Sequence, residues 1–429
     1  MSERQVTQAA HGHILTNIGC WSRDGEWIVY DTRSDAAGSR CDGLWIERVH
    51  VDSGRVERLF ESQRGANCGV VTCCPVSDRI VFILGPERPT AEWQYAATHR
   101  RGVVLDLGLA QSPRQIQALD AMCYCEPFVP GALRGGSHVH TFDGRGRCVA
   151  FTYEDHVLQT AARSTLPPVE LNLRNIGVSF PGRPVEVHGL HPRNHSGSHF
   201  SVLLSQTWDA PEPGSDQIDR AYEDAWIGSD GSGIAFLGDI VGRSGNRMTE
   251  LFALDLPPDA TEAGEAGPLE GTLARRPRPP LGTRQRRLTY TEEYPLPGVA
   301  GPRHWPRSSP DGRAIYFLMR SPDGASQLWS IAPSGGEPKQ LTRLEGRGVT
   351  SAFSVSIDGQ WIAHTADGAV CVTSTETGRT RRLTQPGDLE RGPRAEACVF
   401  SPDARRIAYV RPVAMGPQVW NQVFVVECP

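Results

Sequence analysis

One pattern of polar and apolar residues recurs along the chain: a Ser-x-Asp turn followed at once by a run of apolar residues. Four copies are nearly identical, and they cover residues 22–30, 309–317, 356–364 and 401–409. Three looser copies begin at residues 75, 141 and 228. The aspartates that mark these turns are Asp24, Asp78, Asp143, Asp230, Asp311, Asp358 and Asp403. A tight turn before each short apolar run predicts antiparallel strands, and seven copies at roughly propeller-blade spacing predict a β-propeller.

The remaining strands of each blade are also visible in the pattern. Apolar runs that suit third strands lie at residues 44–49, 251–256, 328–333 and 370–375. After a Gly-bearing hairpin, outer strands spelled RRLT or KQLT follow at residues 286–289, 339–342 and 381–384. These alternating runs separated by Gly turns are typical of hairpins, and they predict four strands per blade.

The two chain ends complement each other. The sequence stops after a third strand at residues 422–427, and it opens with RQVT at residues 4–7, which reads as an outer strand without a blade before it. We therefore predict that the N-terminal strand completes the last blade, with Val6 close to Phe424. Such closure removes the open sheet edges.

The predicted fold is all-β, a single seven-bladed β-propeller domain over residues 1–429. Two insertions are expected within blade four, at residues 208–227 and 257–283. In the first, Ile218, Ala221, Tyr222 and Ala225 have helical spacing and predict a short helix. The second is rich in Pro, Ala and Gly, which predicts an exposed loop. Insertions of this kind often shape a binding mouth.

Composition and charge exclude some classes of partner. The net charge is −5 and the sequence pI is about 6.2, so nothing favours nucleic acid or an anionic membrane. The N-terminus has no basic region followed by an apolar one, and no apolar run approaches the roughly 20 residues of a membrane span. With 11 cysteines and no zinc-type CxxC pair, we expect reduced thiols and a cytoplasmic protein.

Histidines gather in blades three and four. His138 and His140 are two residues apart on a predicted strand, so both should face the same side. That spacing suits a shared metal or ligand, but His140 occupies a position that is apolar in other blades, so a buried core histidine is the alternative. His195 and His199 are expected to lead into the inner strand of blade four, and His304 into that of blade five.

Inner strands line the channel of a propeller, so His138, His199 and His304 could share one divalent metal ion, such as manganese. Neutral imidazole ligates Mn, Fe, Ni and Zn, and mixed histidine and carboxylate sets are usual. No fixed spacing is diagnostic when the ligands come from different blades. Histidines that are hydrogen-bonded within the core are the alternative.

Arginines suggest an anionic ligand instead. Arg134, Arg193 and Arg303 lie near predicted strand ends, and the planar guanidinium pairs with carboxylates or phosphates through two hydrogen bonds. Their alternative role is to cap strand ends. The complete set of predicted ligand-binding residues is Asn17, Arg134, His138, Asp155, His156, Arg193, His195 and Arg303.

Several enzyme signatures are missing from the sequence. It has no GxSxG elbow, no P-loop, no GxGxxG before a helix and no HExxH. A serine hydrolase, a kinase or a Rossmann enzyme is therefore not indicated.

Six segments carry a resemblance to a known family. They are GHILTNIGCWSRDGEWIVYDTR from residue 12, LRGGSHVHTF from residue 133, FTYEDHV from residue 151, HPRNHSGSH from residue 191, PGSDQIDRAYEDAW from residue 213 and PRHWPRSSPDGRAIYFLMR from residue 302. Together they resemble the bacterial YidR family, uncharacterised proteins built from TolB-like, WD40-type repeats. The resemblance implies the propeller fold over almost the whole chain and does not imply an activity.

A more distant resemblance is to oligogalacturonate lyase, a seven-bladed propeller with the same SPDG turns. It implies a manganese ion held by histidines and a glutamine, and β-elimination from an acidic saccharide with help from a basic side chain. Two functions are therefore carried forward. The first is a binding module for a small anionic ligand, such as a sugar acid, or for a protein partner. The second is a metal-dependent lyase that acts on an acidic saccharide.

Overall fold

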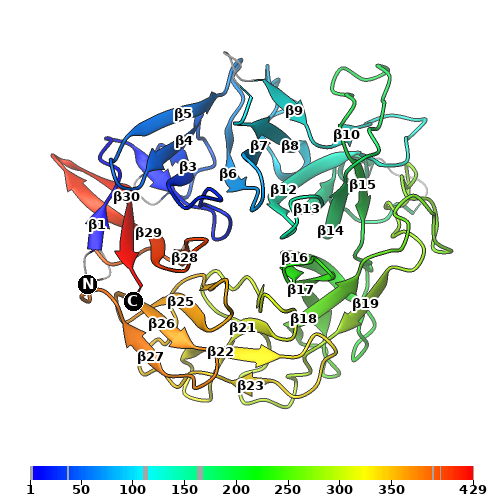
Figure 1. The fold of residues 1–429 in the computed structure, drawn as a ribbon. Coiled ribbons are helices and arrows are strands. Elements are labelled where there is room, and N and C mark those ends of the chain that lie inside the picture. The colour runs from blue at the N-terminus through cyan, green and yellow to red at the C-terminus, as the bar shows by residue number, and fades with distance from the viewer. Residues whose placement is uncertain are drawn as a thin grey trace.

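The computed structural model describes residues 3–35, 38–109, 115–161, 168–388, 391–396 and 398–428. In this part of the chain, seven four-stranded antiparallel sheets are arranged in a ring (Figure 1). Each sheet is one blade, and its first strand lies innermost. The predicted all-β, seven-bladed propeller is confirmed.

Blades one to four follow one another along the chain. Blade one consists of β2 (Gly12–Ile14), β3 (Trp27–Arg33), β4 (Trp45–His50) and β5 (Val56–Glu61). Blade two consists of β6 (Cys68–Cys73), β7 (Arg79–Leu84), β8 (Arg101–Asp106) and β9 (Ile116–Ala118). Blade three consists of β12 (Gly135–Phe142), β13 (Val149–Asp155), β14 (Asn175–Phe180) and β15 (Phe200–Leu203). Blade four consists of β16 (Ile218–Ile227), β17 (Gly233–Val241), β18 (Arg247–Asp255) and β19 (Arg284–Arg287).

Blades five to seven have inner strands of two or three residues. Blade five consists of β20 (Arg307–Ser308), β21 (Ile315–Arg320), β22 (Ser326–Ile331) and β23 (Lys339–Gln340). Blade six consists of β24 (Ser354–Val355), β25 (Trp361–Ala366), β26 (Ala369–Ser374) and β27 (Thr380–Arg382). Blade seven consists of β28 (Cys398–Phe400), β29 (Arg406–Met415), β30 (Gln418–Glu427) and β1 (Glu3–Gln5).

The ring closes as the chain ends predict. Strand β1 lies beside β30 (Figure 1) and runs antiparallel to it, with Gln5 opposite Phe424 in the register. One residue further on, the backbone N–H of Val6 donates to the carbonyl of Val423 at 2.9 Å. The first and last strands of the chain therefore share one sheet, and neither leaves an open edge there.

The recurring Ser-x-Asp turn has a local physical cause. In blade one, the Ser22 hydroxyl donates to the Asp24 carboxylate at 2.5 Å and accepts the backbone N–H of Trp27 at 2.9 Å. In blade six, Ser356 forms the same two bonds, to Asp358 at 2.5 Å and from Trp361 at 3.0 Å. Short polar side chains that satisfy the backbone of a tight turn stabilise the hairpin. The recurrence of this turn along the chain therefore has a structural cause.

The helix expected within residues 213–226 is wrong, because residues 218–227 form strand β16, the inner strand of blade four. Of the insertion expected at residues 208–227, only residues 208–217 lie outside β16. Two register shifts, at 218/220 and 222/225, explain the misleading pattern. Each shift inserts an extra residue into the strand, so buried residues recur at intervals of three or four instead of two.

The position expected for His195 and His199 is also wrong. They precede β15, which is the outer strand of blade three and not the inner strand of blade four. The small elements lie between β7 and β8 of blade two, between blades two and three, and directly after β13 of blade three. These are β10 (Ala121–Met122), β11 (Ala132–Leu133), the short 3-10 helix η1 (Ala97–His99) and helix α1 (His156–Ala161).

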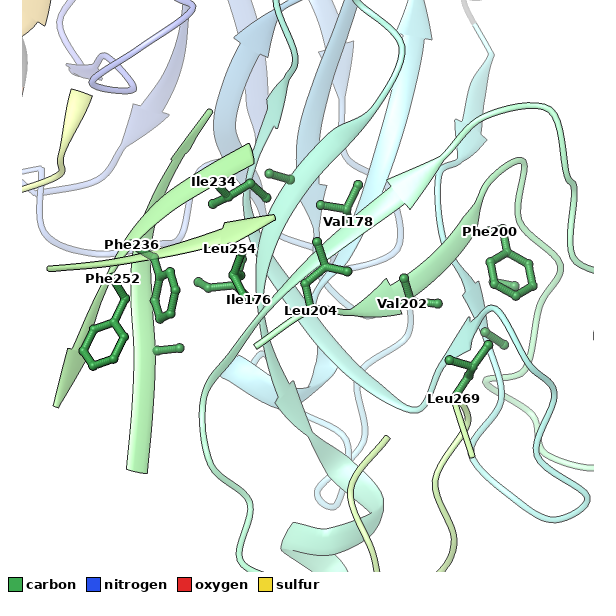
Figure 2. Packing of buried hydrophobic residues seen from close by; sticks show 14 of the residues in the cluster. Ile176, Val178, Phe200, Val202, Leu204, Ile234, Phe236, Phe252, Leu254 and Leu269 are labelled. Carbon is green, nitrogen blue, oxygen red and sulfur yellow. The ribbon is translucent and has the colours of Figure 1, made fainter. Parts of the chain in front are cut away.

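The largest described apolar core lies between blades three and four (Figure 2). Ile176, Val178 and Val202 contribute from blade three, and Ile234 and Phe252 from blade four. Sheets that pack face to face in this way exclude water from both surfaces. This packing fixes β16 against blade three, which matters for the site below.

The segment at residues 257–283 connects β18 to β19 without a described strand or helix. Its role as an insertion and the single domain over residues 1–429 stay predictions. In the part of the chain that the structure describes, no helix is both long and apolar enough to cross a membrane.

Candidate functional site

Three neighbouring inner strands carry the same distortion. Val70 in β6, Val139 in β12 and Glu223 in β16 have positive φ angles of 56°, 53° and 58°. Each lies within a register shift against the second strand of its blade. Val70 and Val139 lie three residues before the last paired residue of their strand, and Glu223 lies four residues before it. Positive φ is costly for a side chain branched at Cβ, by about 1–3 kcal/mol, and such strain clusters at functional sites. The three bulges therefore place equivalent residues at one level of the central channel.

A cavity of about 230 Å³ lies at this level, and we call it the channel mouth. Val70 and Val139 line it, together with the predicted site residues Asn17, His138 and Arg303. The sequence-predicted residues that meet in one place thus come from blade one, blade three and the segment leading into blade five. The other lining residues used below are Thr16, Asp31, Arg33, Cys41 and Glu396.

Asp31 organises one wall of the channel mouth. Its carboxylate accepts the backbone N–H of Val70 at 2.9 Å and pairs with the Arg33 guanidinium at 2.7 Å. Burial raises the pKa of Asp31, although the charge of Arg33 lowers it. Gly69 is required beside this pair, because a Cβ there would lie 2.6 Å from the Asp31 carboxylate. The carboxylate thus holds the first bulge in place.

His138 lies in a positive field. Its Nδ1 is enclosed and has no hydrogen-bond partner. Burial lowers the pKa of His138 well below its ordinary value, and the charges of Arg100 and Arg174 lower it further. The imidazole is therefore neutral at physiological pH. A neutral ring with a free nitrogen among guanidinium groups suits an anionic or hydroxyl-bearing ligand better than a cation.

Arg303 and Asn17 also line the channel mouth. Arg303 pairs with Glu396 at 3.1 Å, and its side chain is 45% exposed. Asn17 is buried, and it accepts the Arg307 guanidinium through both its backbone carbonyl and its side-chain oxygen, each at 3.0 Å. Arg303 is therefore accessible to a ligand. Asn17 connects the channel mouth to charged side chains that are buried further inside the protein.

Those deeper charges are Arg307, Glu223 and Asp224. Arg307 is 4% exposed and Asp224 is 2% exposed. Neither carboxylate oxygen of Asp224 has a hydrogen-bond partner, and the same is true of Glu223 Oε2 and Arg307 Nε. Buried ionisable groups without partners are costly and therefore mark functional sites.

Burial shifts the pKa values of these groups. Burial and the neighbouring Asp224 raise the pKa of Glu223 to about 8. Burial raises the pKa of Asp224 to about 7, against the opposing charge of Arg307. Burial also lowers the pKa of Arg307 to about 10, although both carboxylates raise it. Two carboxyl groups whose pKa values are raised to near neutral pH therefore lie close to Arg307, on the inner strand of blade four.

The other end of the channel is different. A second cavity, of about 380 Å³, is lined by residues from all seven blades next to the Ser-x-Asp turns. Its wall includes Trp21, Phe142, Trp226 and Phe400, and Arg307 also reaches it. The charged end of Arg307 thus belongs to the boundary between an apolar cavity and the polar channel mouth.

Arg134 and Asp155 lie outside the channel mouth and contact each other. The Arg134 guanidinium pairs with Asp155 at 2.8 Å, and both side chains are at most 2% exposed. Arg134 also donates to the backbone carbonyls of Thr272 and Arg275, the second at 2.7 Å. These contacts anchor the segment at residues 257–283 to blade three.

His156 belongs to an aromatic cluster at the rim of blades two and three. Its Nδ1 lies 3.0 Å from Nε2 of His99, and its ring lies 4.4 Å from that of Trp93. Arg193 donates to the carbonyls of Glu87 at 2.6 Å and Arg88 at 3.0 Å. The cluster therefore holds together loops from two blades.

His195 and His140 are occupied by local hydrogen bonds. His195 exchanges backbone hydrogen bonds with Met122, and its Nδ1 lies 3.1 Å from the carbonyl of Ser196. His140 is fully buried, with Nε2 3.0 Å from the Ser137 hydroxyl and 3.8 Å from Asp120. The expectation that His138 and His140 face the same side is wrong, because the bulge at Val139 interrupts the alternation.

The three histidines predicted as metal ligands have separate surroundings. His199 contacts the Ser198 hydroxyl at 2.9 Å, and His304 Nδ1 contacts the carbonyl of Gly301 at 2.7 Å. Among the described residues, no group of three or more His, Cys, Asp or Glu side chains is arranged to hold a metal ion. His138, His199 and His304 therefore do not fit a shared manganese ion.

Sequence reasoning missed Arg33, Glu223, Asp224 and Arg307. The signal for two of them was present, since consecutive acidic residues interrupt the otherwise apolar segment YEDAW at residues 222–226. It was obscured by the helical spacing of the neighbouring apolar residues. Arg307 follows a proline and begins a strand of two residues, so its pattern carries no signal.

Comparison with known proteins places the chain. A family profile described as "Protein of unknown function (DUF3748)" matches residues 67–195. The "Uncharacterized protein YidR" of Escherichia coli (strain K12) is 43% identical over 421 residues, which cover 97% of this chain and 96% of that protein.

Two solved structures are similar at low identity. "Oligogalacturonate lyase in complex with manganese" has a TM-score of 0.58 and 11% identity, and the match covers 100% of this chain and 93% of that one. "The structure of putative TolB from Agrobacterium tumefaciens" has a TM-score of 0.42 and 14% identity over 87% of this chain and 94% of that one. At 11% identity, the likeness to the lyase shows a similar fold and nothing more. On the evidence of its full-length relative, the chain belongs to the YidR family.

Proposed function

We propose that the protein is a binding module that takes a small anionic ligand, such as a sugar acid, into the channel mouth. The observation that carries the proposal is the convergence of Asn17, His138 and Arg303 on one cavity of about 230 Å³. Ligand sites are concave and contain a few precisely placed polar groups, and a cavity of this size suits a small molecule.

The charge of the wall supports an anion. The field of Arg100 and Arg174 acts on His138, and Arg33 adds to it. Arg303 is partly exposed, so its guanidinium can exchange Glu396 for a ligand carboxylate without a large desolvation cost. The unpartnered Thr16 hydroxyl and His138 Nδ1 supply hydrogen-bonding groups for ligand hydroxyls.

Two alternatives remain for comparison. A protein partner would use a wider surface than a cavity of this size, although propellers with large rim loops suit that role. A lyase that acts on an acidic saccharide is suggested only by the fold of a distant neighbour, which is bound to manganese. The described histidines give no ligand set for such an ion, so we place binding first.

The experiment is calorimetric titration with D-galacturonate, and D-galactose serves as the neutral ligand of matched shape. We expect D-galacturonate to bind and D-galactose to bind at least about tenfold more weakly, since a charged hydrogen bond contributes about 1.5–3 kcal/mol. Arg303→Gln should weaken binding of D-galacturonate by a similar factor.

A matched control is Arg382→Gln, since Arg382 is 48% exposed and pairs with Asp367 at 2.8 Å, far along the chain in blade six. Its binding should equal that of the wild type. Equal binding of D-galacturonate and D-galactose, or equal loss in the Arg303 and Arg382 variants, would overturn the proposal. Release of an unsaturated, ultraviolet-absorbing product from oligogalacturonate would favour the lyase instead.

A further inference from the structure

We propose that Glu223 and Asp224 form a proton-accepting subsite in the channel, and that an anion which binds at the channel mouth is taken up together with a proton. This inference rests on the proposed function and adds a pH-dependent control to the same site. The ligand class is a small anion whose own charge does not change near neutral pH.

The position of the pair follows from the equivalent bulges. Glu223 occupies the place that Val70 and Val139 hold in the two preceding blades, and both valines line the channel mouth. One residue beyond Asp224, Ala225 already lines the apolar cavity at the other end. The acidic pair therefore lies between residues that line the two cavities, although neither acidic residue lines either cavity itself.

The hydrogen bonds of the pair are incomplete. Asp224 is 2% exposed, and neither of its carboxylate oxygens accepts a hydrogen bond. Glu223 Oε2 is enclosed and also lacks a partner. Of the remaining polar atoms nearby, Arg307 Nε is enclosed and unused as well. A fully structural acidic pair would be expected to have these bonds filled.

The surrounding charges are mostly positive. Arg307 on β20 acts on both carboxyl groups, and Arg303 and Arg174 act on Glu223. Arg174 precedes β14 and is itself paired with Glu154 on β13. On β17, Asp239 accepts the hydroxyls of Tyr222 and Thr249, at 2.9 and 2.8 Å, and so is already satisfied. The proton affinity of the pair thus depends on burial opposed by three guanidinium groups.

An anion at the channel mouth changes this balance. It neutralises part of the guanidinium field that favours the ionised carboxylates, and its own charge repels them. Each effect favours protonation of Glu223 or Asp224. Because coupling between two bound species is reciprocal, protonation must increase the affinity for the anion by the same factor. Burial already raises the pKa of Glu223 to about 8 and that of Asp224 to about 7, so the exchange falls in the physiological range.

The test uses sulfate as the probe, because sulfate keeps its charge from about pH 6 to about pH 9. Titration calorimetry in two buffers of different ionisation enthalpy gives the number of protons taken up. We expect uptake of a substantial fraction of a proton near pH 7.5 and about tenfold tighter sulfate binding at pH 6 than at pH 9, for a coupling of about one pKa unit.

The paired variant Glu223→Gln/Asp224→Asn removes both titrating groups and keeps their shape. We expect it to bind sulfate at pH 9 as tightly as the wild type does at pH 6, without proton uptake. Glu337→Gln changes an exposed glutamate in blade five and should behave as the wild type. If the paired variant does not fold, the single variants Glu223→Gln and Asp224→Asn should each reduce the uptake.

The outcomes separate the two proposals. Sulfate binding without proton uptake, or unchanged uptake in the paired variant, would overturn this inference and leave the anion site standing. No sulfate binding at any pH would overturn the anion site and this inference with it. Loss of uptake in the Glu337 variant would also count against the assignment, because that residue lies away from the channel.

Discussion

The buried carboxyl of Asp224 makes a prediction about stability that needs no ligand. Its ordinary pKa is 3.8, and burial raises the pKa to about 7 in the folded protein. A carboxyl group with a raised folded pKa holds its proton more tightly in the folded than in the unfolded chain. The free energy of unfolding therefore falls as pH rises from about 4 to about 7, and this contribution is constant above that window.

The magnitude follows from the two pKa values. One pKa unit corresponds to about 1.4 kcal/mol, so the penalty for ionised Asp224 is on the order of 4 kcal/mol above neutral pH and about 1.6 kcal/mol at pH 5. Asp224→Asn keeps the shape and cannot ionise. We therefore expect the variant to be more stable than the wild type, and the difference should grow by about 2–3 kcal/mol between pH 5 and pH 8.

The assay is urea unfolding of both proteins at half-unit pH steps over this range. Taking the difference between the two proteins cancels the titration of all other groups. Glu337→Gln is the control, since Glu337 is exposed, and its difference from the wild type should be flat with pH. A variant that is less stable than the wild type at every pH would refute the reasoning, because it would show that the Asp224 carboxylate has a stabilising partner. A difference independent of pH would refute it as well.

Much of the fold was predictable because each blade repeats the same local physics. The Ser-x-Asp turn satisfies its own backbone, so the four close copies form the same turn in four different blades. The pairing of β1 with β30 was predictable because the first residues have the pattern of an outer strand and the last residues have the pattern of a third strand. In both cases the sequence signal is local, or it repeats elsewhere in the chain.

The candidate site was only partly predictable, because bulges have no regular sequence signal. At Val139 the bulge turns His138 and His140 to different surroundings, which strict alternation does not anticipate. In β16 two shifts give a strand the apolar spacing of a helix, so the pattern predicts a helix within an insertion where the acidic pair at residues 223–224 lies on an inner strand. The convergence of Asn17 and Arg303 depends on closure of the whole ring, and no spacing along the chain encodes it.

Three further predictions test contacts that hold the propeller and its channel mouth in shape. Arg134→Met should lower the free energy of unfolding by about 3–5 kcal/mol, because it leaves the buried Asp155 unpaired; a thermal or urea unfolding curve equal to that of the wild type would contradict this. Deletion of residues 3–7 should abolish single-step unfolding, since it removes the strand that closes the ring; calorimetry that still gives one sharp transition would show that closure is dispensable. Gly69→Ala should cost about 1–3 kcal/mol, because the new Cβ would lie 2.6 Å from the Asp31 carboxylate, and that carboxylate is buried and cannot move aside without losing its bond to the bulge. The same variant should weaken anion binding at the channel mouth more than the stability loss alone explains, because the displaced carboxylate would release the wall of the cavity. Unchanged affinity in a destabilised Gly69 variant would mean that the bulge shapes the strand and leaves the ligand unaffected.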